Sequence, residues 1–340
     1  RETYGHGNKK IFKIDPPPSQ HKELIPRQPL TPSYSAYIKI AEGCSNGCTF
    51  CYIPYVRGAM RSRSIPSVVH EVKRLSSEGV REFNLIAQDS SFYGRDLNDG
   101  TPHARLLKEL VKIDNVKWIR LFYLYPTYFD DELLEIITKE EKICKYVDIP
   151  LQHISDSVLG RMHRRDSSQS IKKLLKKLRN TTPYITIRTT LMVGFPGETE
   201  ADFKELLTFI KAVKFDNMGA FTYSAQDGTP AARMVNQVTE EIKENRYHEL
   251  MAAQAEISEE NNRNLIGVDT EVLVEELLDD GCGNLQAKGR ASFQAPEVDG
   301  NVYIDHPGDL RPGDFVKAHI IDGYAYDLIA ERITTDRGIR

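Results

Sequence analysis

Residues 42–51 read Glu-Gly-Cys-Ser-Asn-Gly-Cys-Thr-Phe-Cys, which places Cys44, Cys48 and Cys51 in a C-x3-C-x2-C pattern. The pattern directly follows residues 35–41, which are expected to form a strand because of their β-prone composition. Loops at the carboxyl ends of strands carry ligands and catalytic groups in β-α architectures. Thiolates spaced this closely need a positive partner, and a soft metal or an iron–sulfur cluster is the natural one.

Three interpretations of these cysteines remain open. A structural zinc ion needs four protein ligands, and the next candidate along the chain is His70, across a predicted helix. The three cysteines could instead be incidental members of a core. A cubane 4Fe-4S cluster held by three thiolates would leave one iron without a protein ligand, and a substrate or cofactor could chelate that iron.

Strand-like and helix-like segments alternate around and beyond this motif. Strands are expected at 35–41, 81–87, 117–124, 146–150, 185–193 and 217–223, and helices at 67–78, 102–113, 130–138, 168–180 and 199–213. This alternation predicts an α/β fold built of parallel β-α units. Six strands are too few for a closed eight-stranded barrel, so an open partial barrel or a doubly wound sheet is expected.

The chain is expected to divide into four parts. Residues 1–33 are rich in proline and are interpreted as a linker or strap, and residues 34–238 as the α/β domain. Residues 239–265 form a predicted connecting helix. Residues 266–340 contain short β-prone segments at 271–275, 302–304, 315–321 and 327–333, separated by Gly and Pro turns, which predicts a small antiparallel β-barrel.

Composition excludes several classes of protein. The 340 residues are 40% hydrophobic and 28% charged, which is typical of a globular protein rather than a disordered one. No apolar run approaches the roughly 20 residues that span a bilayer, so no membrane location is expected. Five cysteines are an odd number, which argues against a disulfide framework and favours the cytoplasm. The chain begins at Arg1 without a signal peptide, and we interpret it as a piece of a longer protein.

The net charge of −4 is unevenly distributed. Residues 266–340 hold 15 Asp and Glu against 7 Lys and Arg, whereas the rest of the chain has a net charge of +4. Such asymmetry predicts a charged partner, with a solvated acidic surface as the alternative. The candidate partner-binding residues are in the densest acidic run: Glu275, Glu276, Asp279 and Asp280.

The cysteine spacing resembles that of the radical S-adenosylmethionine (SAM) superfamily. In that superfamily SAM binds the open iron, and an electron from the cluster cleaves it to a 5′-deoxyadenosyl radical that abstracts hydrogen from an unactivated carbon. The resemblance implies that Cys44, Cys48 and Cys51 hold a 4Fe-4S cluster and that SAM is the second cofactor. It also suggests further cofactor-binding residues near the ends of later strands: Phe50, Gln88, Ser155, Arg188, Gly194, Gly197 and Glu198.

These further residues have alternative interpretations. Phe50 matches the aromatic residue that packs near the adenine of SAM, but it could be a plain core residue. Gln88 closes the second strand, where the superfamily contacts the methionine amino group. Arg188 could face the SAM carboxylate or form a structural ion pair inside the barrel. The turn 194–198 resembles the one that approaches the adenine edge, but it could be merely a good strand-to-helix turn.

Longer phrases resemble the methylthiotransferases within this superfamily. These are CYIPYVRG at 51–58 with RSR at 61–63, LQH at 151–153 with SDSVL at 155–159, and VGFPGET at 193–199. The resemblance runs from about residue 34 to the end. It implies a partial (β/α)6 TIM barrel followed by a small OB-like TRAM barrel.

Two branches of that family differ in substrate. One modifies an adenosine in tRNA. The RimO-type branch adds a methylthio group to the β-carbon of an aspartate in the twelfth small-subunit ribosomal protein. The phrases IAQD at 86–89, YLYP at 123–126 and DIPLQH at 148–153 look like the ribosomal branch. Charge favours the same branch, because an acidic barrel would repel RNA and attract a basic ribosomal protein. A tRNA enzyme is the alternative.

The sequence departs from the family at its start. Full-length members carry an N-terminal domain whose three further cysteines hold a second iron–sulfur cluster, and these 340 residues contain no such triplet. Cys144 and Cys282 are interpreted as structural, with Cys144 at a predicted helix end. The chain is therefore expected to cleave SAM and dock the substrate, with electrons from a donor such as a flavodoxin or ferredoxin. A non-catalytic iron–sulfur or zinc scaffold that binds the ribosome or RNA is the alternative from another class.

Overall fold

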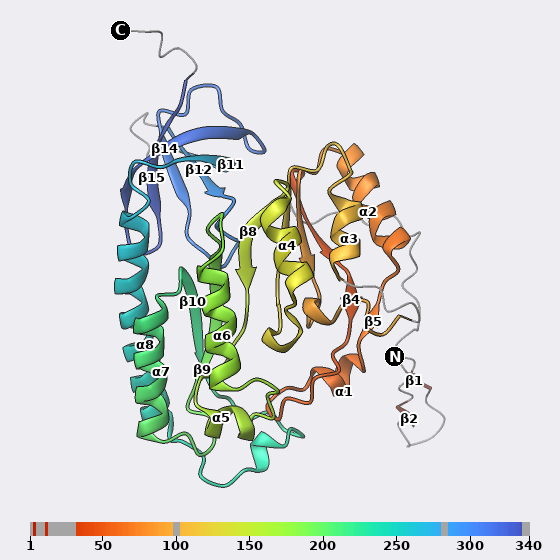
Figure 1. Cartoon of the computed structure of the whole chain (residues 1–340), viewed down its shortest axis with the longest axis vertical. Helices are drawn as coiled ribbons and strands as arrows, with labels where there is room; N and C mark the ends of the chain where they lie inside the picture. Colours follow the sequence, from red (N-terminus) through yellow and green to blue (C-terminus); the bar gives the residue numbers. More distant parts are fainter. Residues whose placement is uncertain (1–2, 5–10, 13–31, 98–102, 280–284, 335–340) are drawn as a thin grey trace.

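The computed structural model describes residues 3–4, 11–12, 32–97, 103–279 and 285–334. At its centre is a parallel six-stranded sheet whose strands follow one another in chain order (Figure 1). They are β3 (Ser35–Lys39), β6 (Glu82–Ile86), β7 (Trp118–Leu121), β8 (Ile143–Asp148), β9 (Thr186–Val193) and β10 (Asn217–Thr222). Sequential order without closure confirms the predicted partial (β/α)6 barrel.

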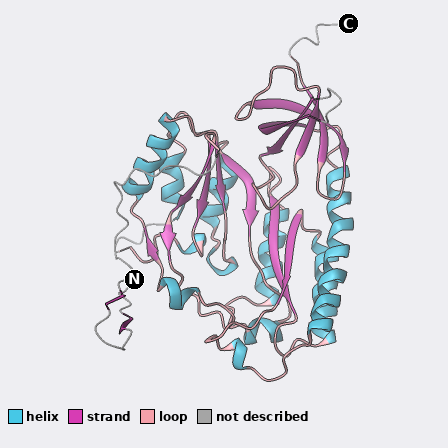
Figure 2. Ribbon diagram, turned by 180° about the vertical axis from the view of Figure 1, so that it is seen from behind, coloured by secondary structure: helices cyan, strands magenta, loops and turns pink. Residues whose placement is uncertain are grey.

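Helices cover one face of this sheet. Figure 1 shows them in front of the strands, and Figure 2, from behind, shows the strands in front. They are α2 (Ile65–Ser77), α3 (His103–Leu110), α4 (Asp131–Lys139), α6 (Ser168–Arg179) and α7 (Glu200–Val213). Four begin at a side chain that accepts a backbone N–H of the first turn, namely Ser64, Asp130, Ser167 and Thr199. Such caps satisfy donors that the helix itself leaves unpaired.

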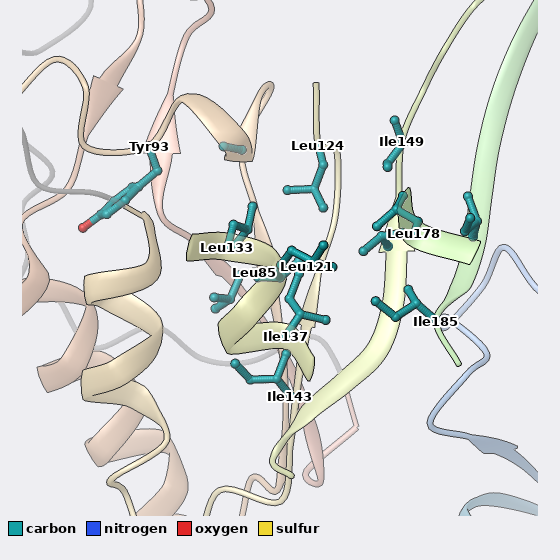
Figure 3. Close-up of a cluster of buried hydrophobic side chains, with 14 of the residues drawn as sticks. Leu85, Tyr93, Leu121, Leu124, Leu133, Ile137, Ile143, Ile149, Leu178 and Ile185 are labelled. Carbon is teal, nitrogen blue, oxygen red and sulfur yellow. The ribbon is translucent and has the colours of Figure 1, made fainter. Parts of the chain in front are cut away.

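The main core lies between the helices and the sheet. Leu133 and Ile137 of α4 are four residues apart and therefore share one helix face. They approach Leu85 and Leu121 of the sheet, as Figure 3 shows. Leu85, Leu121 and Ile137 are each at most 1% exposed. Burial of each such side chain contributes about 1.5–3 kcal/mol, so this layer holds the strand ends in place.

A long helix and a closed five-stranded barrel follow the sheet. Helix α8 spans Glu240–Arg263. The barrel strands are β11 (Asp269–Asp279), β12 (Leu285–Ala291), β13 (Val302–Asp305), β14 (Phe315–Gly323) and β15 (Leu328–Arg332). Its closed order is β11-β12-β13-β15-β14, which confirms the predicted small barrel.

The C-terminal barrel packs where the sheet strands begin. Trp118, the first residue of β7, meets Phe315 edge to face with ring centroids 4.8 Å apart. Tyr146 Oη donates to Asp299 Oδ2 at 2.7 Å, and Arg120 Nη1 donates to the carbonyl of Ser292 at 2.7 Å. The opposite end of the sheet, where the strands finish, is therefore left free for a ligand site.

Several details differ from the sequence expectations. Strand β12 was not expected, because its segment LQAKGRA is polar and contains a glycine. Strand β8 begins at Ile143, so Cys144 is a buried strand residue and not a helix end. Strands β13 and β15 are parallel, unlike the other four pairs of the barrel, because β15 returns between β13 and β14.

Shorter elements complete the described residues. They are the strands β1 (Thr3–Tyr4), β2 (Ile11–Phe12), β4 (Ala41–Glu42) and β5 (Arg61–Ser62), the helices α1 (Ile53–Arg57) and α5 (Asp156–Arg161), and the 3-10 turns η1 (Ser90–Phe92), η2 (Pro126–Tyr128) and η3 (Ala231–Arg233). The predicted linker 1–33 lies mostly outside the described residues. The four-part division of the chain stays a prediction.

Candidate cofactor site

The cysteine loop leaves the first strand through a tight turn. Gly43 has φ +80°, and a Cβ there would lie 2.3 Å from the carbonyl oxygen of Ala59. Only glycine fits such a backbone. Cys44 N then donates to Gly58 O at 3.1 Å, and Thr49 N donates to Met162 O at 3.0 Å. The first bond connects the start of the loop to Gly58, which follows the loop in the chain. The second connects the loop to the end of α5.

The loop opens on a cavity of about 260 Å³ at the carboxyl ends of the parallel strands. Its lining comes from the cysteine loop, from the segments that follow β6, β7 and β8, from β9, and from Arg164 after α5. The lining residues are Cys44, Asn46, Cys48, Phe50, Cys51, Gln88, Asp89, Tyr123, Leu124, Tyr125, Pro150, Gln152, Arg164 and Thr190. All three cysteines of the motif therefore face one space, together with polar groups from four strands.

The electrostatics of the cavity favour a cationic ligand for the thiols. Burial raises the pKa of the Cys44 thiol to about 11 and also raises the pKa of Cys48. Burial raises the pKa of Asp89 as well, although Ser91 and Asn46 donate to its carboxylate. Burial therefore disfavours the ionised forms of these groups. Iron bound by the thiolates would supply positive charge that stabilises them.

Two observations test whether a cluster fits these residues. The amide oxygens of Gln88 and Gln152 are buried at the cavity and have no hydrogen-bond partner among the described residues. Acceptors placed in this way suit a ligand that carries donor groups. Within the described ranges, no three His, Cys, Asp or Glu side chains are grouped to hold a single metal ion. A cubane suits this spacing better than zinc, because each thiolate binds a different iron.

Two of the seven non-glycine residues with positive φ in the described part of the chain lie at the same cavity. Tyr123 has φ +56° and Gln152 has φ +69°, and both line it. Non-glycine residues with positive φ cost about 1–3 kcal/mol and cluster at functional sites. Tyr123 N donates to Asp148 Oδ2 at 3.1 Å, and Gln152 N donates to Thr190 O at 2.9 Å. These bonds offset the strain and hold both residues toward the cavity.

The predicted residues Phe50 and Gln88 lie at this cavity with the cysteines. Phe50 also packs edge to face on Phe195, with ring centroids 6.3 Å apart. Phe50 thus contributes both to the cavity wall and to a hydrophobic cluster, and its contact with the adenine of SAM stays a prediction.

The predicted turn 194–198 lies behind the cavity wall. Gly194 has φ +74°, and a Cβ there would lie 2.2 Å from Cγ of Lys243 on α8. Gly197 has φ +78° and faces Arg161. The Glu198 carboxylate accepts from Gly194 N at 2.7 Å and from Arg246 Nη1 at 2.9 Å. Glu198 thus holds the shape of the turn, and a direct contact of this turn with SAM stays a prediction.

Ser155 and Arg188 have structural partners. Ser155 Oγ donates to Asp202 Oδ1. Arg188 Nη1 donates to Asp148 Oδ1 at 3.1 Å, and its Nε lies 3.3 Å from Asp299 Oδ1 of the C-terminal barrel. Neither side chain lines the cavity described above, so their cofactor contacts also stay predictions.

The acidic run divides in the structure. Glu275 Oε1 accepts from Arg290 at 2.8 Å, so its charge is used inside the protein. Glu276 is 56% exposed and lies 3.6 Å from Lys288. Asp279 ends β11, and Asp280 lies outside the described residues. The docking role of this run stays a prediction.

Sequence reasoning missed several lining residues, chiefly Asn46, Tyr123, Gln152, Arg164 and Thr190. Tyr123 and Gln152 lie within the sequence phrases that resemble the family, and this position could have marked them as site residues. Arg164 carried no signal, because one of two adjacent arginines in a polar turn is ordinarily a surface residue.

Two family models match the chain. The Radical SAM superfamily model matches residues 38–210, which is about half of the chain, and the TRAM domain model matches residues 266–333. The chain is thus a radical SAM protein with a TRAM barrel. Escherichia coli coproporphyrinogen III oxidase (HemN), a radical SAM enzyme, shares this fold with TM-score 0.50 and 15% identity, over 66% of this chain and 52% of that one.

Curated relatives define the family more narrowly. Ribosomal protein uS12 methylthiotransferase RimO of Geotalea uraniireducens is 49% identical over 311 residues, which is 92% of this chain and 69% of that protein. The RimO protein of Citrifermentans bemidjiense is 50% identical over 312 residues, again 92% of this chain and 69% of that protein. The chain belongs to the RimO methylthiotransferase family. These relatives favour the ribosomal branch over the tRNA alternative.

Helix length and hydropathy bear on membrane insertion. In the part of the chain that the structure describes, no helix is both long enough and apolar enough to cross a bilayer.

Proposed function

We propose that this chain carries the SAM-cleaving and substrate-docking parts of an enzyme that adds a methylthio group to the β-carbon of an aspartate in ribosomal protein uS12. The observation that carries the proposal is that Cys44, Cys48 and Cys51 all line one cavity. The chain that forms this cavity is 50% identical in sequence to a RimO protein. A ribosomal substrate places the enzyme in the cytoplasm, where thiols stay reduced.

The residues of the cavity suit both cofactors. Cys44, Cys48 and Cys51 would each bind one iron of a 4Fe-4S cluster. When bound, the cluster and SAM supply a carbon radical that removes a hydrogen atom from the substrate carbon. The free amide oxygens of Gln88 and Gln152 offer acceptors to amino or hydroxyl groups of SAM.

Aromatic side chains keep water from this site. Tyr125 is 7% exposed, and its ring lies beside Arg164. Phe50 closes another wall against Phe195. Exclusion of water protects a reactive carbon radical from side reactions. Tyr123 is 48% exposed at the mouth of the cavity, where a substrate side chain would enter.

A second cavity suits a basic segment of uS12. It measures about 640 Å³ and lies between the start of β3 and the C-terminal barrel. Four acids line it, but Glu275 and Asp299 pair with Arg290 and Arg188, so Glu276 and Glu297 carry its acidic character. Lys288 is its one lining cation among the described residues. Ribosomal proteins are basic because they bind RNA, and opposite charge steers association. We assign uS12 docking to this acidic cavity.

Two further components complete the proposal. A small one-electron carrier, such as a flavodoxin or ferredoxin, reduces the cluster. The donated sulfur comes from a second 4Fe-4S cluster held by three cysteines outside these 340 residues. Cys144 is 3% exposed within β8 and serves packing rather than cluster binding.

Isotope transfer tests the proposal on this chain without a sulfur donor. The chain is reconstituted anaerobically, reduced, and given SAM with uS12 whose aspartates are deuterated at the β-carbon. We expect deuterium in 5′-deoxyadenosine, because the radical takes its hydrogen from that carbon.

A matched reaction with tRNA in place of uS12 serves as control and should leave 5′-deoxyadenosine formation at its substrate-free rate. Stimulation by tRNA, with no deuterium transfer from uS12, would overturn the proposal in favour of the tRNA branch. Absence of 5′-deoxyadenosine from a chain with full iron content would favour a scaffold.

A further inference from the structure

Arg164 is the only cation among the described residues that line the cysteine cavity. It follows α5 in the chain and lies 116 residues beyond Cys48, yet both residues line the same cavity. Burial raises the pKa of the Cys48 thiol, and the Arg164 charge opposes that shift. Its side chain is only 5% exposed. A charge at this depth is costly unless it has partners, so its contacts are informative.

The known contacts of Arg164 fix its plane but leave a donor free. Nη2 donates to the carbonyl of Pro150 at 2.9 Å and to Asp166 Oδ2 at 3.4 Å. The guanidinium carbon lies 3.9 Å from the centre of the Tyr125 ring, which is stacking distance. The buried Nε has no hydrogen-bond partner among the described residues. The structure therefore holds a rigid, buried cation with an unused N–H beside a cluster ligand.

Asp166 neutralises this cation only in part. Asp166 Oδ1 accepts from Thr127 at 2.6 Å, and its Oδ2 is 3.4 Å from Arg164. The other acid at the cavity, Asp89, accepts from Asn46, Ser91 and Phe92 and not from Arg164. The charge of Arg164 acts on the Cys48 sulfur and also on the Asp89 carboxylate.

We propose that Arg164 sets the reduction potential of the cluster by placing its charge and an N–H donor against the Cys48 sulfur. Hydrogen bonds to ligand sulfurs and nearby net charge both control iron–sulfur potentials. An added electron makes the cluster more negative, so a fixed guanidinium stabilises the reduced form more than the oxidised one. This inference deepens the proposed function, because it concerns the cluster of that same site.

The test compares two adjacent arginines. Arg164→Met removes the charge and the donor, whereas Arg165→Met removes an exposed arginine that contacts Tyr128. Each variant is reconstituted and titrated with reductant, without SAM or uS12, while the reduced cluster is followed by electron paramagnetic resonance. For Arg164→Met we expect a ratio of reduced to oxidised cluster at least tenfold lower at a given potential, which is about 59 mV for one electron. For Arg165→Met we expect no change.

If the Arg164→Met variant does not bind the cluster, a second variant and a second measurement still test the inference. Arg164→Lys keeps the charge without the planar fork, and its potential should lie between those of the wild type and the neutral variant. In the unaltered chain, arginine labelled with ¹⁵N should produce a ¹⁵N coupling in the electron spin echo spectrum of the reduced cluster.

A wild-type potential in both Arg164 variants overturns the inference, and so does absence of the ¹⁵N coupling. An unchanged potential with weaker SAM binding also overturns it, because Arg164 would then be a SAM contact. None of these readouts involves uS12, so failure of the inference is distinguishable from failure of the proposed function.

Discussion

Arg290, on a strand of the C-terminal barrel, makes a bidentate ion pair with Glu82 at the start of β6. Nη1 donates to Oε1 at 3.1 Å and Nη2 to Oε2 at 2.8 Å, and both side chains are at most 2% exposed. Arg290 also pairs with Glu275, and Glu82 pairs with Arg120 at 3.4 Å. This buried network joins residues 208 positions apart and holds the barrel against the sheet.

Removing one member of the network should destabilise the protein strongly. Arg290→Met leaves the buried Glu82 carboxylate with Ser35 as a donor at 2.8 Å and with Arg120, at 3.4 Å, as its remaining cation. Breaking a buried ion pair costs about 3–5 kcal/mol. The matched control is Arg332→Met, whose partner Asp309 is 89% exposed, and it should cost about 0–1 kcal/mol. Urea unfolding measures both. Equal decreases in the free energy of unfolding of the two variants would show that the buried ion pair does not stabilise the packing of the barrel on the sheet.

Acid should weaken the same contact. Although burial opposes it, the Arg290 charge lowers the pKa of Glu82 to about 2, from an ordinary value of 4.5. A depressed carboxyl pKa contributes stability that is present above 4.5 and is lost as the pH falls toward 2. The difference in unfolding free energy between wild type and Glu82→Gln should therefore shrink across that interval. A difference that stays constant from pH 5 to the lower limit of folding would contradict the assignment.

The cluster should depend on three cysteines and not on the fourth described one. Ala at Cys44, Cys48 or Cys51 should abolish most of the visible charge-transfer absorbance of the reconstituted chain. The wild type should bind about four irons and about four sulfides, as a cubane requires. Cys144→Ala, in the core of β8, should keep both. Retained absorbance in Cys48→Ala would contradict the ligand assignment.

The turn after β9 should tolerate no side chain. Gly194→Ala combines a positive φ with a Cβ 2.2 Å from Lys243 Cγ, and we expect a loss of about 1–3 kcal/mol. Gly79→Ala, at φ +106° with no atom within 4 Å, isolates the backbone strain and should cost less. Thermal unfolding compares the variants. If Gly194→Ala destabilises the protein no more than Gly79→Ala does, the Lys243 side chain moves aside without an energetic cost. The close approach of Gly194 to Lys243 would then not contribute to stability.

Docking of uS12 should weaken with salt and with charge reversal at the acidic cavity. Glu276→Lys with Glu297→Lys should slow association, because surface charges act mainly on the encounter and are screened over about 8 Å at physiological salt. Glu249→Lys, exposed on α8 away from the cavity, serves as a single-charge control. Stopped-flow binding to isolated uS12 gives the rates. Tighter binding of tRNA than of uS12 by the unaltered chain, at matched salt, would refute the charge argument.

The sequence alone determined the features that depend on local patterns. The spacing of three cysteines within residues 44–51 predicted the cluster loop. Alternating strand and helix periodicity predicted parallel β-α units, and the family resemblance selected the partial barrel among the folds that such units allow. Both signals survive without tertiary information, because ligand spacing and amphipathic period are properties of short segments. The acidity of the C-terminal quarter was likewise visible from composition.

Only the tertiary structure decided which distant residues share the site. It brought Arg164 into the same cavity as Cys48 across 116 positions, and it paired Glu275 with Arg290, so that an acid chosen for docking is used internally. It also placed Tyr123 and Gln152 at positive φ. No local pattern encodes such contacts, because the convergence of strand ends and the packing of the barrel determine them, and packing can hold a strained backbone that local preference would reject.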